Sequence, residues 1–156
     1  MNRDIKIDDS YGSFKDRVNG ILIYNNKILL VKMHSNSFYC LPGGHVKLGE
    51  SSEEAIIREM KEETGYNVNV NKLVAITENF FTRKDGKKIH ELGFYYLADI
   101  YNQEIKEINS KKEEDNITLE FKWLDINKLG DIEFKPIEIT EKIINKDLSF
   151  SHIIIK

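Results

Sequence analysis

GGHVKLGESSEEAIIREMKEETGY, residues 43–66, contains a helix together with the residues that start and end it. Ser51 followed three residues later by Glu54 matches a capping box, in which hydroxyl and carboxylate bind backbone N–H groups at a helix N-terminus. Gly65 fits the C-terminal end, because glycine takes the left-handed conformation at little steric cost. The sequence therefore predicts a helix over residues 52–64.

This helix has an unfavourable distribution of charge. At about 100° per residue, one arc holds Ala55 together with three acids, Glu59, Glu62 and Glu63. The adjoining arc is apolar and is formed by Ile56, Ile57 and Met60. Glutamates three and four residues apart repel by about 0.2–0.5 kcal/mol per pair, and the helix dipole disfavours anions near the C-terminus. Arg58 can reach Glu62, but one arginine cannot neutralise three carboxylates. A divalent cation such as Mg²⁺ or Mn²⁺ prefers hard oxygen ligands and would compensate.

The residues before the helix suit the same kind of site. Gly43 and Gly44 allow a backbone carbonyl or N–H group to approach a metal or a phosphate closely. Glu50 lies just before the helix cap, where it can pair with Arg58, approach the metal, or remain a plain surface carboxylate.

One fixed spacing connects these residues. Gly44 is followed after five residues by Glu50, then by Arg-Glu-Met at 58–60, Glu-Glu at 62–63 and Gly-Tyr at 65–66. This pattern resembles the signature of the Nudix hydrolases. Seven fixed residue types at fixed spacing arise by chance less than about once in 10⁷ starting positions. Tyr66 is the one departure, since the family usually has an aliphatic residue there, and a tyrosine ring can still pack.

The resemblance implies an α/β fold, a Nudix-like α/β/α sandwich with a mixed β-sheet and with the metals on the signature helix. The implied reaction is attack of water on a diphosphate linkage in a nucleoside diphosphate linked to another group, with Mg²⁺ or Mn²⁺ as cofactor. The implied metal ligands are Gly43 through its carbonyl, Glu50, Glu59, Glu62 and Glu63. The implied catalytic residues are Glu59, which accepts the proton of water, Glu62, and Arg58, which orients either Glu50 or Glu62.

The identity of the general base stays open, because some members of the family use a glutamate from a distant loop. Glu113, Glu114 and Glu120 are candidates for that role here. For the first two, a solvated charge run is the simpler explanation.

Substrate choice also stays open. Some diphosphate-sugar hydrolases of the family have a proline, and some dinucleoside polyphosphate hydrolases a tyrosine, near the position of Phe81, and neither is present. Several aromatic residues could stack on a base or belong to the core: Phe80, Phe81, Tyr95 and Trp123. His90 and Glu91 could touch a substrate or form a surface pair.

A different class of function is possible on the same fold, namely a non-catalytic domain that binds a nucleotide or metabolite and regulates a partner. The intact set of acids favours the enzyme, because a binding domain has no need of three mutually repelling carboxylates. A diphosphate isomerase would require further Cys or Glu chemistry that the sequence does not reveal.

The rest of the chain is predicted to alternate strands, turns and one more helix. Strands are expected at residues 18–24 and 27–33 (a hairpin around Asn25 and Asn26), 68–81 and 89–101 (a hairpin around 83–86), and 119–124. Residues 38–41 form a short apolar run that ends at a loop signal, Pro42-Gly43-Gly44. We expect a polar loop over 102–116 and a helix over 136–146 with Ile139 and Ile143 on one face. Residues 149–155 should pair with a sheet edge, within the chain or across a homodimer.

Composition limits the class of protein. The 156 residues, 40% hydrophobic and 31% charged, predict a single globular domain over residues 1–156. A net charge of −3 argues weakly against an extended nucleic-acid partner and does not exclude a small phosphorylated substrate held through a metal. The small-molecule nucleotide, or nucleotide derivative, expected as partner is what the Nudix resemblance implies. No apolar run reaches the roughly 20 residues of a membrane helix, and the N-terminus lacks a leader pattern, so we expect no membrane partner and a cytoplasmic location. Cys40 is the only cysteine, which excludes an internal disulfide and favours a buried structural thiol.

Overall fold

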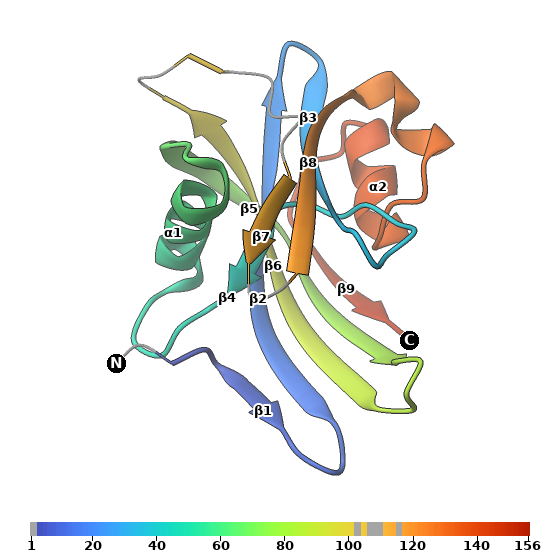
Figure 1. Cartoon of the computed structure of the whole chain (residues 1–156). Helices are drawn as coiled ribbons and strands as arrows, with labels where there is room; N and C mark the ends of the chain where they lie inside the picture. The colour runs from blue at the N-terminus through green and yellow to red at the C-terminus, as the bar shows by residue number, and fades with distance from the viewer. Residues whose placement is uncertain (1–2, 102–103, 106–110, 115–116) are drawn as a thin grey trace.

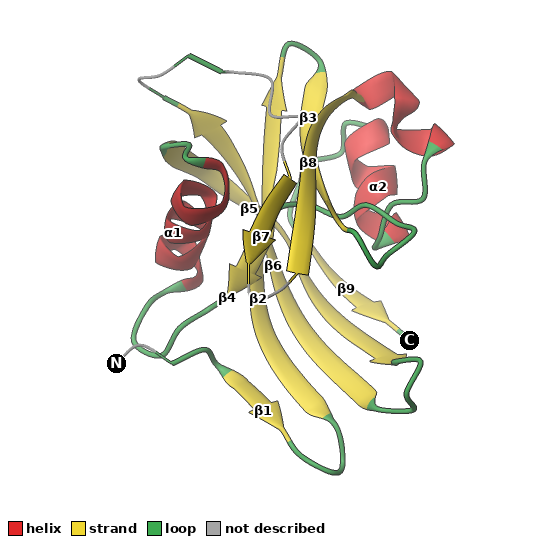
Figure 2. Ribbon diagram, viewed as in Figure 1, coloured by secondary structure: helices red, strands yellow, loops and turns green. Residues whose placement is uncertain are grey.

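The computed structural model describes residues 3–101, 104–105, 111–114 and 117–156. A β-sheet lies between two helices, α1 (Ser52–Thr64) on one side and α2 (Ile137–Ile144) on the other (Figures 1 and 2). The strands in this part of the chain are β1 (Lys6–Asp8), β2 (Ser13–Tyr24), β3 (Lys27–Met33), β4 (Gly43–His45), β5 (Val68–Thr82), β6 (Lys88–Ile100), β7 (Lys111–Glu114), β8 (Ile117–Asp125) and β9 (Ser151–Ile155). A short 3₁₀ helix, η1 (Ile126–Asp131), follows β8.

The sheet is mixed, as expected. Its main order is β7-β8-β3-β2-β6-β5-β9, with β1 and β4 paired to the free edge of β2. The β2–β6 and β5–β9 pairs are parallel, and the other pairs are antiparallel. This arrangement of helices on both faces of a mixed sheet confirms the predicted α/β/α sandwich.

Both predicted hairpins form. Asn25 and Asn26 join β2 to β3 with φ values of 49° and 59°, which is the left-handed geometry of a tight hairpin turn. Gly86, with φ of 84°, completes the turn between β5 and β6. These turns fix the registers of the two hairpins.

Helix α1 has the predicted boundaries. The Glu54 N–H donates to Ser51 Oγ over 3.1 Å, and the Ser51 N–H donates to Glu54 Oε2 over 2.7 Å, so the capping box is complete. Gly65, with φ of 78°, ends the helix and donates its N–H to the Lys61 carbonyl. Met60 is fully buried, whereas Ile57 is 41% exposed. The expectation that Ile57 belongs to the apolar arc was wrong, because only the narrower arc of Ala55, Ile56 and Met60 faces the sheet.

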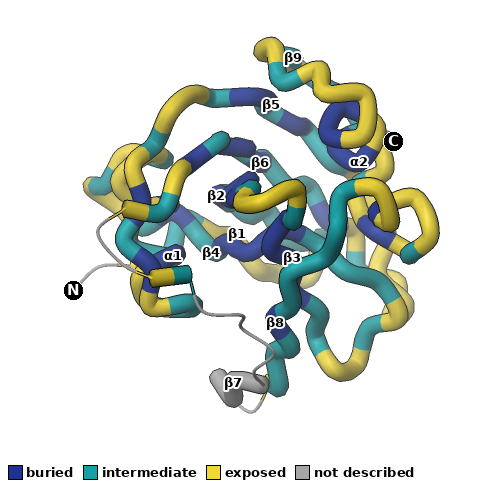
Figure 3. Tube along the Cα trace, turned by 90° about the horizontal axis from the view of Figure 1, so that it is seen from above, coloured by how far each residue is buried: buried dark blue, intermediate teal, exposed yellow. Residues whose placement is uncertain are grey.

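Each face of the sheet carries its own hydrophobic core. On one face Ala55, Ile56 and Met60 of α1 pack with Val18 and with other residues of the strands, and on the other face Ile139 and Ile143 of α2 do so, as predicted for that helix. Seen from above, the buried residues concentrate in the strands and on the inner sides of both helices (Figure 3). The central strand β2 therefore contacts both layers.

Four segments differ from the sequence prediction. Gly43–His45, expected as a loop, forms β4, because its backbone pairs with β2 although its glycines carry no strand signal. Strand β2 begins five residues early, at Ser13, where β1 pairs with it. Helix η1 was not expected. Residues 102–116 were expected to be a loop, but Lys111–Glu114 forms β7 against β8; the rest of that prediction falls largely outside the described residues.

The C-terminal segment pairs with a sheet edge within the chain. Strand β9 runs parallel to β5, and His152 lies 2.8 Å from the Glu78 carboxylate. Cys40 forms an isolated antiparallel bridge with Val31 of β3, and burial raises the pKa of its thiol to about 11, which fits the expected structural role. In the part of the chain that is described, no helix has the length and apolar character needed to cross a membrane.

Burial along α1 yields a stability prediction. Met60→Ala should lower the free energy of unfolding by about 2–5 kcal/mol, because it leaves a cavity between helix and sheet. Ile57→Ala, three residues earlier on the exposed side, is the matched control and should change it by less than about 0.5 kcal/mol. Chemical denaturation of both variants measures the difference; equal effects would contradict the described packing of α1.

Candidate functional site

Arg58 is the centre of the signature site. Its Nε donates to Glu50 Oε2 over 3.0 Å and its Nη2 to Glu50 Oε1 over 2.5 Å, a bidentate pair. Its Nη1 donates to Glu59 Oε1 over 2.6 Å and to Glu62 Oε2 over 3.1 Å. Nη2 also donates to the His45 carbonyl over 3.0 Å, which connects helix α1 to β4. Arg58 thus contacts both of the carboxylates that were expected to compete for it, and a third as well.

Glu50 is fixed from two sides. Besides the pair with Arg58, its Oε1 accepts the Lys47 N–H over 2.8 Å. The Glu50 N–H in turn donates to the Lys47 carbonyl over 3.2 Å, and Gly49 has a φ of 92°, so the loop between β4 and α1 closes on this carboxylate. These contacts engage both oxygens of Glu50 in holding Arg58 and the loop.

The position of the Glu59 carboxylate requires a glycine at residue 44. A Cβ atom at Gly44 would lie 2.3 Å from Glu59 Cδ and 2.4 Å from both carboxylate oxygens. The Glu59 carboxylate therefore rests against the backbone of β4, and its side chain is only 13% exposed. Close approach, rather than unusual backbone geometry, explains this glycine of the signature.

Gly43 brings Glu63 into the same region. Gly43 is the partner of Asn19 in the antiparallel β2–β4 ladder, between residues whose backbones bond to β2. Because hydrogen bonding alternates along such a ladder, the Gly43 amide and carbonyl point away from β2. Its N–H donates to Glu63 Oε2 over 3.2 Å, so these groups lie beside the C-terminal half of α1.

The environment shifts the pKa values of Glu50 and Glu59 in opposite directions. Hydrogen bonds from Arg58 hold the pKa of Glu50 below its usual value. Burial raises the pKa of Glu59, and this effect exceeds the opposing contribution of Arg58. His45, whose pKa burial lowers to about 4, is neutral at pH 7. The site therefore contains one well-neutralised carboxylate and one that the single arginine does not fully compensate.

The donor set fits a hard divalent cation. Glu59, Glu62 and Glu63 present carboxylate oxygens from one end of α1, next to the backbone of Gly43. Mg²⁺ and Mn²⁺ prefer such oxygens and need few protein ligands, because they keep several waters. In the described ranges no three His, Cys, Asp or Glu side chains lie close enough together to hold a metal ion, and Glu59 and Glu62 are turned toward Arg58.

The structure separates the aromatic candidates. Tyr95 is 4% exposed and belongs to the core beneath α2, and Trp123 packs against Tyr66 with ring centroids 6.3 Å apart. Tyr66, the departure from the signature, is 3% exposed and fills the core beside α1. Burial therefore keeps Tyr95 from stacking on a substrate, and Trp123 is partly buried beside Tyr66.

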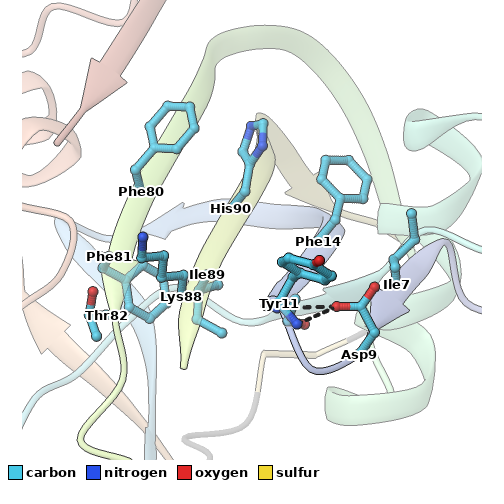
Figure 4. Close-up of a pocket in the computed structure, with 12 residues that line it drawn as sticks. Ile7, Asp9, Tyr11, Phe14, Phe80, Phe81, Thr82, Lys88, Ile89 and His90 are labelled. Carbon is cyan, nitrogen blue, oxygen red and sulfur yellow. Dashed lines mark hydrogen bonds between the residues drawn. The ribbon is translucent and has the colours of Figure 1, made fainter. Parts of the chain in front are cut away.

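Phe80, Phe81 and His90 instead come together in a pocket of about 450 Å³ at the far end of β2, β5 and β6 (Figure 4). His90 packs between Phe14, at 5.3 Å, and Phe80, at 4.3 Å, measured between ring centroids. Phe14 precedes Val18, the partner of Gly44, by four residues, which at about 3.3 Å each is roughly 13 Å along the strand. This pocket is therefore apart from the carboxylates.

Glu120, one of the candidate distant bases, points away from the α1 face of the sheet. Leu119 and Phe121 of β8 pack in the core beneath α1, so Glu120 between them points to the opposite face of the sheet. Glu91 likewise alternates with His90 and lies on the face opposite α1. The side chains of Glu113 and Glu114 lie outside the described residues.

One residue of this region escaped the sequence analysis. Arg17 lies on β2 directly opposite His45 of β4, one residue before Val18, which pairs with Gly44. A single arginine in a predicted strand carries no motif, and only the β2–β4 register places it at the signature. A strand containing Arg17-Val18-Asn19 was a possible signal, because two polar residues alternate there on a strand with helices over both faces.

A family model for the NUDIX domain matches residues 14–144. The chain belongs to the Nudix family. It is 33% identical over 120 residues to an ADP-ribose pyrophosphatase of Methanocaldococcus jannaschii, a match that covers 75% of this chain and 65% of that protein. It is 45% identical over 56 residues to a putative 8-oxo-dGTP diphosphatase of Bacillus subtilis, which covers 36% of this chain and 38% of that protein. The matched part thus spans less than two thirds of either relative.

Solved structures show the same fold. The crystal structure of an ADP-ribose pyrophosphatase from Streptococcus suis aligns with a TM-score of 0.62 over 90% of this chain and 98% of that one, at 19% identity. At this level of identity the likeness concerns the Nudix fold. Together with the family match, it confirms the resemblance drawn from residues 44–66.

The contacts of Arg58 yield a pH-dependent stability prediction. Arg58→Ala should lower the free energy of unfolding at pH 7 by about 2–3 kcal/mol, because it leaves half-buried carboxylates without their charged donor. The Glu50 contribution is complete above the ordinary pKa of 4.5 and is lost as the pH falls through its lowered pKa, so the two proteins should converge below pH 4.5.

Urea unfolding of both proteins from pH 3 to 8 measures this. Arg83→Ala is the control, since Arg83 forms an exposed pair with Asp85 within one turn, and its stability should match the wild type throughout. An Arg58→Ala penalty that persisted unchanged at pH 3 would show that lost packing, not charge, is responsible.

Proposed function

We propose that this chain is a metal-dependent pyrophosphohydrolase that cleaves the diphosphate linkage of a nucleoside diphosphate joined to another group, and that residues 1–156 form one catalytic domain. The observation that carries the proposal is the placement of three acids along one side of α1: Arg58 binds Glu59 and Glu62, and Glu63 accepts the Gly43 N–H. The alternative, a non-catalytic nucleotide-binding domain, gains no specific support from this geometry.

Glu59, Glu62 and Glu63 are the proposed ligands of Mg²⁺ or Mn²⁺, together with the Gly43 carbonyl. When bound, such an ion neutralises phosphate oxygens and lowers the pKa of coordinated water. Arg58 positions Glu59 and Glu62 by direct hydrogen bonds, which fixes the directions of their remaining oxygens. Glu50 was also predicted as a ligand, but its contacts support the role of holding Arg58.

Glu59 is the proposed acceptor of the water's proton. Of its two carboxylate oxygens, Oε1 accepts from Arg58, and the group rests against Gly44, so its position is fixed without a flexible loop. Its half-buried setting, which raises its pKa, suits proton acceptance better than a fully solvated carboxylate.

ADP-ribose is the first substrate to test, because the archaeal relative of that name matches three quarters of this chain, whereas the match to the putative 8-oxo-dGTP diphosphatase covers 36%. Turnover should be measured with Mg²⁺ or Mn²⁺ against ADP-ribose, 8-oxo-dGTP, unmodified nucleoside triphosphates and dinucleoside polyphosphates. Hydrolysis of any of these supports the enzyme. Binding of a nucleotide with no turnover in the whole panel would instead establish the regulatory alternative.

Metal binding should stabilise the fold. Because Glu59, Glu62 and Glu63 repel one another without a cation, Mg²⁺ or Mn²⁺ should raise the melting temperature by mass action on the folded state. Glu62→Gln should reduce the increase, and Glu53→Gln, in the exposed first turn of α1, should leave it intact. Thermal melts with EDTA and with increasing Mn²⁺ decide this; a melting temperature indifferent to millimolar metal would refute the assigned ligands.

Replacing the charged side chain by glutamine should have different effects on stability at Glu59 and at Glu50. Glu59→Gln should reduce turnover at least ~10²-fold, the lower end for loss of a general base, without lowering the melting temperature in EDTA, because burial already disfavours the charged form. Glu50→Gln should lower the melting temperature, because Arg58 favours the charged form there. Steady-state rates and melts of both variants test the assignment, and a destabilised but fully active Glu59→Gln protein would overturn it.

A further inference from the structure

Arg17 is a half-buried arginine with no hydrogen-bond or ion-pair partner among the described residues. Two other arginines of the chain do have partners. Arg58 contacts three carboxylates, and Arg83 pairs with Asp85. Removing part of a guanidinium from water is unfavourable, and an anionic partner, which Arg17 lacks among the described residues, would offset that cost. This setting therefore points to an anion that binds to the protein.

The strand register places Arg17 at the edge of the proposed active site. Arg17 is opposite His45, and Asn19, two residues on, is opposite Gly43. Residues directly opposite in a ladder point to the same face, and diagonal neighbours lie about 7–8 Å apart, within reach of a long side chain. Arg17 can thus extend along β2 toward the Gly43 backbone on the face of the sheet away from α1, while Glu59 approaches Gly44 from the α1 face.

Other side chains cover Gly93, the residue of the neighbouring strand beside Arg17. On β6 its register partner is Gly93, which has no side chain. A Cβ atom at Gly93 would lie 2.7 Å from Thr77 Oγ1, 3.1 Å from the Tyr95 ring and 3.7 Å from Asn19 Nδ2, so these groups lie on the same face as Arg17. The polar groups of Thr77 and Asn19 therefore lie close to the backbone beside Arg17.

Charges on this face do not neutralise Arg17. Glu91 lies on the same face but forms no ion pair with it, and Lys15, two residues before Arg17, adds a second cation. The positive charge of Arg17 contributes to lowering the pKa of Lys15, after the larger effect of burial, and it also opposes the raised pKa of Glu59. Arg17 is thus electrostatically coupled to the carboxylate site although it touches none of its residues.

We infer that Arg17 is a substrate-binding residue that holds a phosphate group of the diphosphate, next to the phosphate that lies at the carboxylates. A planar guanidinium can donate two parallel N–H bonds to phosphate oxygens, which matches the chemistry of this substrate class. The inference rests on the proposed function for the identity of the phosphate, and on the geometry of Arg17 for the existence of the anion site.

The test compares Arg17→Ala, Arg17→Lys and the control Arg83→Ala with the wild type. With ADP-ribose and Mg²⁺, kcat/KM of Arg17→Ala should fall about 10- to 100-fold, the effect of one lost charged hydrogen-bond donor, and Arg17→Lys should recover part of it. Arg83→Ala should match the wild type. The melting temperature of Arg17→Ala in EDTA should not fall, because Arg17 has no partner to lose, whereas a structural role would lower it.

A binding measurement separates this inference from the proposed function. Calorimetry with inorganic pyrophosphate in EDTA should show binding to the wild type and at least tenfold weaker binding to Arg17→Ala. Failure of the wild type to bind pyrophosphate, or equal affinity in Arg17→Ala, would overturn the anion site. Loss of pyrophosphate binding in Arg17→Ala with no turnover of any substrate by the wild type would support the anion site and refute the hydrolase alone.

Discussion

The pairing of Arg58 with Glu50 is the interaction on which the site depends. It joins the loop after β4 to the middle of α1, and the same guanidinium then reaches Glu59, Glu62 and the His45 carbonyl. Because Glu50 accepts two of these bonds and a backbone N–H, Arg58 has a fixed plane. The remaining carboxylates take their directions from that plane, so their geometry is set before any metal or substrate binds.

Two glycines make this arrangement possible. Gly43 and Gly44 pair with β2 as a short strand. The missing side chain of Gly44 lets the Glu59 carboxylate of α1 meet the backbone, whereas a side chain at Gly43 would clash with the backbone of β2. Glu63 accepts the Gly43 N–H. Helix α1 is held in this position by Met60 and Ile56, which pack over Gly20 of β2. One arc of α1 therefore packs against the sheet, and the adjoining arc carries the acidic residues of the proposed site.

Local signals predicted much of this from the sequence. Helix α1 was predicted to the residue, because Ser51, Glu54 and Gly65 fix its ends through contacts within a few positions. The hairpin at Asn25-Asn26 was predicted for the same reason. Strand β4 was not, because its pairing with β2 is a long-range backbone contact that two glycines conceal. Arg17 was missed on the same grounds, since its place beside the signature exists only through the β2–β4 register.

Ion pairing with Arg58 does not neutralise all the carboxylates of the site. Arg58 lowers the pKa of Glu50, yet burial still raises the pKa of Glu59. One guanidinium therefore stabilises the charged form of Glu50 but does not offset the cost of burying the charge of Glu59. A fully compensated cluster would bind a cation weakly, because the cation would have to displace the arginine. An uncompensated one retains attraction for a divalent ion while Arg58 keeps the ligands in place. The proposed cation would offset the uncompensated charge of Glu59, which links the unfavourable charges of α1 to the proposed chemistry.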